Sequence, residues 1–225
     1  WPRQAEETIV ARDCELAAFT GAHLHVAHVS AAGTLDFIRR AKGKGTRVTA
    51  EVTPHHLTLT DDLVGGHWWS ATASLPPYDT RTKVNPPLRE PDDRDAMVAG
   101  LRDGTIDCIA TDHAPHGTTD KHVEYAAAAS GISNLETALG SVLSIVHAGA
   151  LTLVDVVAAL TCRPAQVFGL EAGALAVGAP GDVVIFDPDR EWCVDPAQFA
   201  SKGRNTPLAG HILRGQVVAT IVGGE

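Results

Sequence analysis

The sequence contains little cysteine, few aromatic residues and no long hydrophobic run. Its cysteines lie far apart and form no CxxC pair, which argues against a zinc ribbon or a disulfide scaffold; they are Cys14, Cys108, Cys162 and Cys193. No run of about 18 apolar residues is present, so no membrane span is expected. The first residues lack a basic region followed by an apolar one, so no secretory signal is expected either. These absences favour a cytoplasmic protein with reduced thiols.

Charge and length narrow the class of protein further. The 225 residues carry a formal net charge of −9, with 18 lysines and arginines against 27 acidic residues. No basic patch recurs along the chain, so nucleic acid is not expected as a partner. Apolar residues make up 44% of the chain, an ordinary globular composition for one large domain or one and a half typical ones.

Short apolar segments alternate with helical patterns in the first half of the chain. Strands are expected at 23–30, 47–54 and 106–111, and helices at 3–19, 30–43 and in the segment that ends near Arg102. The stretch 85–93 is expected to be irregular because it holds three prolines. This alternation is typical of βα units and predicts a parallel sheet.

The second half changes from helical to β-rich sequence. Helices are expected near 135–148 and 153–161, and the second has Thr152 and Asp155 at the spacing of a capping box. From residue 182 the segments GDVVIFDPD and HILRGQVVATIVGG are rich in β-formers. They suggest a small β appendage.

Two of the expected strands end in side chains that bind metals. His28 ends the first strand, and Asp112 ends the third in the stretch IDCIATDHAPHG. Functional side chains collect at the carboxyl ends of parallel strands, so we expect these two on neighbouring strands, where an imidazole and a carboxylate suit a zinc-type cation. The remaining histidines of these segments are interpreted as structural or surface residues: His23, His25, His55, His56 and His113.

Several motifs together resemble those of the dihydroorotases, cyclic amidohydrolases of pyrimidine biosynthesis. The motifs occur in order over nearly the whole chain: HVAHVSAAGT, VTAEVTPHHLTLT, KVNPPLRE, DGTIDCIATDHAPH, GISNLETAL and NTPLAGHILRGQVVAT. VNPPLR, TDHAPH and GI…LET are specific in combination. A dihydropyrimidinase would instead carry a serine-aspartate-histidine-cysteine string where TDHAPH stands.

The resemblance implies a fold and a metal centre. It implies an α/β fold, with residues 1–175 as the C-terminal portion of a (β/α)8 barrel (strands six to eight) and residues 176–225 as late strands of a small β-sandwich. His28 falls on the metal-ligand histidine of the sixth strand. Asp112 falls on the aspartate that ends the eighth strand, which binds the metal and acts as general acid and base. One or two divalent metals, zinc in type, are implied.

The resemblance also implies a substrate and a reaction. Asn85 and His116 would hold the ring and carboxylate of a small anionic cyclic substrate, and Gly131 lies in a loop whose backbone touches that ring. The implied reaction is the reversible hydrolysis of the cyclic amide of dihydroorotate to N-carbamoyl-aspartate. Asp112 would take a proton from the attacking hydroxide and pass it to the ring nitrogen.

The chain lacks the other ligands that the resemblance calls for. The His-x-His of the first strand, the acidic or lysine ligand of the fourth and the histidine of the fifth are absent, although a catalytic zinc normally takes three protein ligands. We therefore expect the chain to be the C-terminal half of such an enzyme, inactive and poorly folded unless the N-terminal half or a second chain completes it. The implied partners are a second copy in a homodimer and, as a further candidate, aspartate transcarbamoylase.

Two alternatives to this interpretation stay open. One is another cyclic amidohydrolase, namely a dihydropyrimidinase, hydantoinase or allantoinase. The other is an inactive dihydroorotase-like subunit that acts as a scaffold for aspartate transcarbamoylase, against which the presence of Asp112 and His116 argues. The loop with Trp68 and Trp69 is interpreted as an extra segment that packs as plain loop, or serves as a lid or a contact surface.

Overall fold

The protein has a mixed α/β fold built on a short parallel sheet. A computed structural model describes residues 1–67 and 75–225. The three strands β1 (Leu24–Val26), β2 (Val48–Val52) and β3 (Cys108–Ile109) pair in parallel in the order β1-β2-β3. The strands are shorter than the sequence suggested, because the polar residues that follow each apolar run leave the ladder. The parallel arrangement is confirmed.

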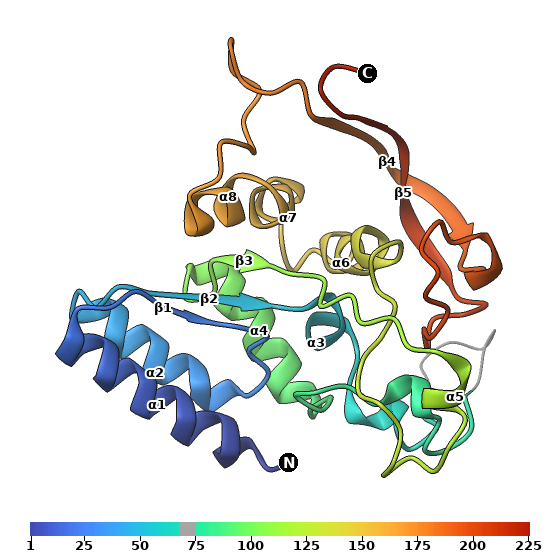
Figure 1. Cartoon of the computed structure of the whole chain (residues 1–225), viewed down its shortest axis with the longest axis horizontal. Helices are drawn as coiled ribbons and strands as arrows, with labels where there is room; N and C mark the ends of the chain where they lie inside the picture. The colour runs from blue at the N-terminus through green and yellow to red at the C-terminus, as the bar shows by residue number, and fades with distance from the viewer. Residues whose placement is uncertain (68–74) are drawn as a thin grey trace.

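Helices cover this sheet and connect its strands (Figure 1). Four of them belong to the first half of the chain: α1 (Arg3–Thr20), α2 (Ala32–Gly43), the short α3 (Pro54–Thr58) and α4 (Pro91–Asp103). The expected irregularity of 85–93 is wrong at its end, since α4 begins at Pro91. Proline is tolerated there because the first residues of a helix have no partner for their N–H groups.

The second half adds short helices and a separate β-hairpin. The helices are α5 (Thr118–Lys121), α6 (Ala138–His147), α7 (Leu153–Leu160) and α8 (Cys162–Phe168), followed by the 3-10 turn η3 (Pro196–Gln198). Two further 3-10 turns, η1 (Asp61–Leu63) and η2 (Thr80–Thr82), lie in the first half, between α3 and α4. α7 and α8 contact β3. Strands β4 (Val183–Cys193) and β5 (Ile212–Ile221) pair antiparallel and extend away from the three-stranded sheet (Figure 1). No helix in 1–67 or 75–225 is long and apolar enough to cross a membrane.

The main core lies between the parallel sheet and its helices. Leu35 and Ile38 of α2 pack with Met97 of α4 and with Val52 of β2, and all four are at most 1% exposed. Burying each such side chain contributes about 2 kcal/mol. A second, smaller cluster lies where the hairpin end meets the loops after β2; it includes Leu59, Leu63, Ile132, Val194 and Phe199. This second cluster fixes the loops that surround the strand ends.

Helix α2 has its first turn capped by carboxylates from two other helices. Its N-cap residue, Ala31, has no side chain that can accept a hydrogen bond. Glu6 of α1 accepts from the backbone N–H groups of Ser30 and Ala31, both at 3.0 Å. Asp93 of α4 accepts from the N–H of Ala32 at 2.9 Å. The helix that follows the His28 segment is therefore tied to α1 and α4 through otherwise unpaired donors.

Candidate metal and substrate site

His28 and Asp112 follow two strands of the sheet in the same unusual backbone conformation. His28 has φ 41° and Asp112 has φ 47°, so both lie in the left-handed region that few non-glycine residues adopt. The expectation that their strands are neighbours is wrong, because β2 lies between β1 and β3. Backbone strain of this kind collects at functional sites, where the surrounding contacts must hold it in place.

His28 and Glu51 both influence the pKa of the Asp112 carboxyl. Burial raises the pKa of the Asp112 carboxyl above its ordinary value, the nearby His28 imidazole opposes that rise, and the Glu51 carboxylate adds to it. The Nδ1 atom of His28 is buried and has no hydrogen-bond partner among the described residues. A polar atom buried without a partner costs free energy, so His28 and Asp112 are candidates for contacts that the described residues do not supply.

No complete metal site lies within the described ranges. Within 1–67 and 75–225, no group of three or more histidine, cysteine, aspartate or glutamate side chains could hold a metal ion. His28 and Asp112 offer one nitrogen and one carboxylate, the donor types that zinc takes.

His56 is a buried neutral imidazole beneath the loop that carries Asn85. Its Nε2 donates to the carbonyl of Pro86 at 3.0 Å, and its Nδ1 lies 2.8 Å from the Thr53 hydroxyl. The carbonyl can only accept, so Nε2 holds the proton and Nδ1 accepts from the hydroxyl. Burial lowers the pKa of His56 to about 4. Asn85 itself is exposed, and this contact fixes the segment just after it.

The low pKa of His56 predicts loss of stability in mild acid. The unfolded chain binds a proton on this residue below the ordinary pKa of 6.5, whereas the folded chain does so only below about 4. The contribution is therefore complete above pH 6.5 and is lost as the pH falls toward 4, by about 3 kcal/mol. Urea unfolding at pH 7 and pH 4 measures it. In His56→Gln the difference between the two pH values should shrink by that amount, and an unchanged difference would contradict the assignment.

His55 and Asn134 form a buried pair that sequence reasoning missed. Both are 2% exposed. The Asn134 Nδ2 atom lies 3.2 Å from Nδ1 of His55 and donates at 3.0 Å to the carbonyl of Thr111, the residue before Asp112. Burial lowers the pKa of His55 well below its ordinary value, and the nearby His56 and His28 add to that effect. His55 therefore stays neutral at physiological pH.

The residue after Asp112 is held by the same segment. His113 Nδ1 accepts from the backbone N–H groups of Asn134 and Leu135, both at 3.1 Å. Its Nε2 lies 3.0 Å from the hydroxyl of Ser201. Because Nδ1 accepts, Nε2 carries the proton and donates. The structural role expected for His113 agrees with these contacts, which place it as the link between the end of β3 and the C-terminal segment.

His116 and Gly131 lie side by side around a second buried asparagine. A Cβ added to Gly131 would stand 3.0 Å from Nε2 of His116 and 2.4 Å from Cβ of Ala114, so only glycine fits. Asn205 Oδ1 accepts from the backbone N–H of His116 at 3.0 Å, and Asn205 Nδ2 donates to the carbonyls of Gly131 and Ala114, each at 3.0 Å. The structure thus brings together two of the residues that the sequence proposed for the substrate.

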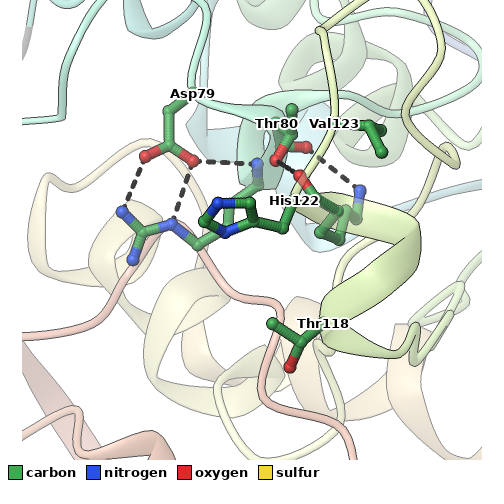
Figure 2. A pocket seen from close by; sticks show the side chains of 7 residues that line it. Asp79, Thr80, Thr118, His122 and Val123 are labelled. Carbon is green, nitrogen blue, oxygen red and sulfur yellow. Dashed lines mark hydrogen bonds and ion pairs between the residues drawn. The ribbon is translucent and has the colours of Figure 1, made fainter.

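An open pocket near the Gly131 loop is lined by other residues than His28 and Asp112. It lies between η2 and α5 and includes Asp79, Thr80 and His122 (Figure 2). Lys121 at its floor donates to the backbone carbonyls of Thr80, Lys83 and Ala129, at 3.1, 3.4 and 2.7 Å. Burial lowers the pKa of Lys121 to about 8. The lysine binds η2 to the loop before Gly131, which is a structural role. Trp68 and Trp69, the suggested lid, lie outside the described residues.

Comparison with known proteins shows which family this chain is similar to. The model of the amidohydrolase family matches residues 3–225. Dihydroorotases of Pelotomaculum thermopropionicum and Anaeromyxobacter dehalogenans are each 54% identical to the chain. Each alignment covers 100% of this chain and 50% of the relative. The chain spans about half the length of the curated relatives that it matches.

Solved structures agree in fold over the same extent. L-Hydantoinase from Arthrobacter aurescens superposes with a TM-score of 0.89 at 30% identity, and the alignment covers 100% of this chain and 49% of that one. Dihydropyrimidinase from Brevibacillus agri superposes with a TM-score of 0.87 at 24% identity, over 99% and 48% of the two chains. The second likeness concerns the fold alone.

Proposed function

This chain belongs to the amidohydrolase family, and from that premise we propose that it is part of a dihydroorotase. The reaction would be the reversible hydrolysis of the cyclic amide of dihydroorotate to N-carbamoyl-aspartate. One observation carries the proposal: the chain is 54% identical over its whole length to proteins that are dihydroorotases, against 30% to an L-hydantoinase.

The half-length match supports a second part of the proposal. β1, β2 and β3 would be strands six to eight of a (β/α)8 barrel within residues 1–175, and the β4–β5 hairpin would belong to a small sandwich within 176–225. Among the described strands, β1 pairs only with β2, so its other edge is available to a further strand. We call the chain together with the segment that completes its relatives' length the complete protein.

His28 and Asp112 would hold a divalent metal of the zinc type in the complete protein. Their donor atoms, the unused buried nitrogen of His28 and the raised pKa of the Asp112 carboxyl support this assignment. The remaining ligands, for one or two ions, would come from the rest of the complete protein. Such an ion lowers the pKa of water and polarises a carbonyl.

Asp112 would also move the proton during hydrolysis. Its carboxylate would accept a proton from the attacking water as the amide carbon becomes tetrahedral, and then give that proton to the ring nitrogen as the C–N bond breaks.

Asn85, His116 and Gly131 would bind the substrate. His116 and the Gly131 loop stand together, and Asn85 lies on an exposed loop whose next residue is anchored to His56. The Asn85 amide and the His116 imidazole can donate hydrogen bonds to a ring and its carboxylate, and such bonds to a charged group are the stronger kind. A small anionic cyclic substrate fits this set.

Location and assembly follow the same proposal. All four cysteines are free thiols, which suits the reducing cytoplasm. A homodimer, with aspartate transcarbamoylase as a further partner, remains part of the proposal and rests on the family resemblance.

A substrate panel tests the proposed function. The complete protein loaded with zinc is expected to hydrolyse dihydroorotate at least about 100-fold more efficiently, in kcat/KM, than dihydrouracil or hydantoin, since those rings lack the carboxylate and leave its donors unpaired. The measurement is the loss of ring absorbance or the release of the ring-opened acid. Preference for an uncharged ring would favour a hydantoinase or dihydropyrimidinase, and no hydrolysis of any ring would favour a scaffold subunit.

A further inference from the structure

We propose that two buried asparagines position the two halves of the site separately. Asn134 sets the backbone around Asp112, and Asn205 sets the loop residues His116 and Gly131. Neither asparagine is a catalytic residue; each acts through the residues that it holds. The inference rests on the proposed function for the roles of the residues held, while the hydrogen bonds that define it stand independently of that function.

The orientation of the Asn134 amide is fixed by its partners. The carbonyl of Thr111 can only accept a hydrogen bond, so the amide atom facing it at 3.0 Å is the NH2 group. On the other side, the hydroxyl of Thr137 donates to Asn134 Oδ1 at 3.1 Å. The second hydrogen of the NH2 group is left for His55 Nδ1 at 3.2 Å. Every polar atom of the Asn134 side chain is thus used.

These contacts hold both sides of Asp112. The carbonyl of Thr111 and the N–H of Asp112 belong to one peptide plane, so the Asn134 side chain fixes the plane from which Asp112 departs at φ 47°. The backbone N–H of Asn134 holds His113 on the other side. The left-handed conformation of Asp112 costs free energy and persists only where neighbouring contacts determine it. Asn134 supplies those contacts from a segment 23 residues away in sequence.

Asn205 has an equally complete set of partners around the substrate loops. Its Nδ2 donates to the carbonyls of Ala114 and Gly131, and its Oδ1 accepts from the N–H of His116 and from the hydroxyl of Ser133. Asn205 thereby joins the loop after β3 to the loop that carries Gly131. It lies in the C-terminal segment, 74 residues from Gly131. None of its partners is Thr111 or Asp112.

The two asparagines therefore act on different steps. A disturbance at Asn134 moves the carboxylate that transfers the proton and holds the metal. A disturbance at Asn205 moves the groups that bind the ring and its carboxylate. Replacement of either by aspartate keeps the shape of the side chain but replaces the NH2 donor by an acceptor, so carbonyls that were paired now face a carboxylate. Residues of this supporting kind change activity by about 10–100-fold.

The experiment compares Asn134→Asp with Asn205→Asp in the complete protein. For N134D we expect kcat to fall about 10–100-fold with KM within about threefold of wild type. For N205D we expect KM to rise at least about tenfold with kcat within about threefold. Two residues that served only the stability of the fold would lower the melting temperature and leave both constants of the folded fraction unchanged, or change them alike. Either of those results would overturn the inference.

Milder variants cover the case in which an aspartate variant does not fold. Thr137→Val removes the hydroxyl that orients Asn134, and Ser133→Ala removes the hydroxyl on Asn205. We expect Thr137→Val to lower kcat and Ser133→Ala to raise KM, each by less than the corresponding aspartate variant. Thr105→Val is the matched control: it removes a buried hydroxyl that accepts from Arg39 and lies three residues before β3, and it should change neither constant.

A metal spectrum separates this inference from the proposed function. In the complete protein loaded with Co²⁺, N134D should change the visible absorption because Asp112 moves, whereas N205D should keep the wild-type spectrum. If wild type binds Co²⁺ but does not hydrolyse dihydroorotate, the proposed function fails and the spectra alone judge the inference. Identical spectra for N134D and wild type would then overturn it.

Discussion

Replacing Asp112 by asparagine is expected to lower the hydrolysis of dihydroorotate by the complete protein by about 1,000-fold or more. The amide has the size of the carboxyl but can neither accept the proton of the attacking water nor return it to the ring nitrogen, and general acid–base groups contribute about 10²–10⁴-fold. The loss should appear in kcat. Zinc content, measured on the same samples, should also fall because a neutral amide binds a divalent cation less well than a carboxylate.

Asp107 provides a matched control at the other end of the same segment. Its carboxylate accepts from the N–H of Ala50 and from Lys42, both at 2.7 Å. Asp107→Asn keeps one acceptor and loses a charge, so we expect a stability loss of about 1 kcal/mol with kcat unchanged. Equal losses of kcat in the two variants would show that the effect comes from the fold and not from proton transfer.

The isolated 225-residue chain is expected to show no measurable hydrolysis and to self-associate. It offers two ligands where a catalytic zinc takes about three from the protein. β1 has one edge unpaired among the described strands, and exposed strand edges pair with other chains. Large apolar side chains of α1 are also exposed, among them Ile9 at 49%, Leu16 at 52% and Phe19 at 89%.

Mixing the chain with the separately produced remainder of the complete protein tests this expectation. Dihydroorotate hydrolysis and size-exclusion elution are measured for each part alone and for the mixture. We expect activity and a defined size only in the mixture. An active, monomeric 225-residue chain would show that His28 and Asp112 suffice as ligands and that the remainder of the complete protein is not required for the chemistry.

Local sequence patterns predicted most of the elements of this fold. The capping box of α7 acts within a few residues, so its effect can be predicted from a short stretch of sequence. The start of α4 was missed because proline was treated as a breaker where it occupies the first turn. α8 gave no signal of its own, since it is only seven residues long.

The site was less predictable because its supports come from distant segments. His28 and Asp112 stood out as polar residues after apolar runs. Asn134 and Asn205, in contrast, gain their importance from partners up to 79 and 91 residues away, so no spacing could reveal them. The sequence predicts structural roles for His55 and His56, and the contacts of His56 with Thr53 and Pro86 agree with that prediction. The motif GISNLET, which contains Asn134, was the one feature of the sequence that pointed to either asparagine.

The shared capping of α2 has a consequence for the order in which the protein is made. Its first turn needs Glu6, which leaves the ribosome before it, and Asp93, which lies 61 residues beyond Ala32. The N–H of Ala32 therefore lacks its protein acceptor until α4 has been synthesised. The N–H groups of Ser30 and Ala31 can pair with Glu6 as soon as they are made, whereas that of Ala32 finds its partner only after residue 93 has been added.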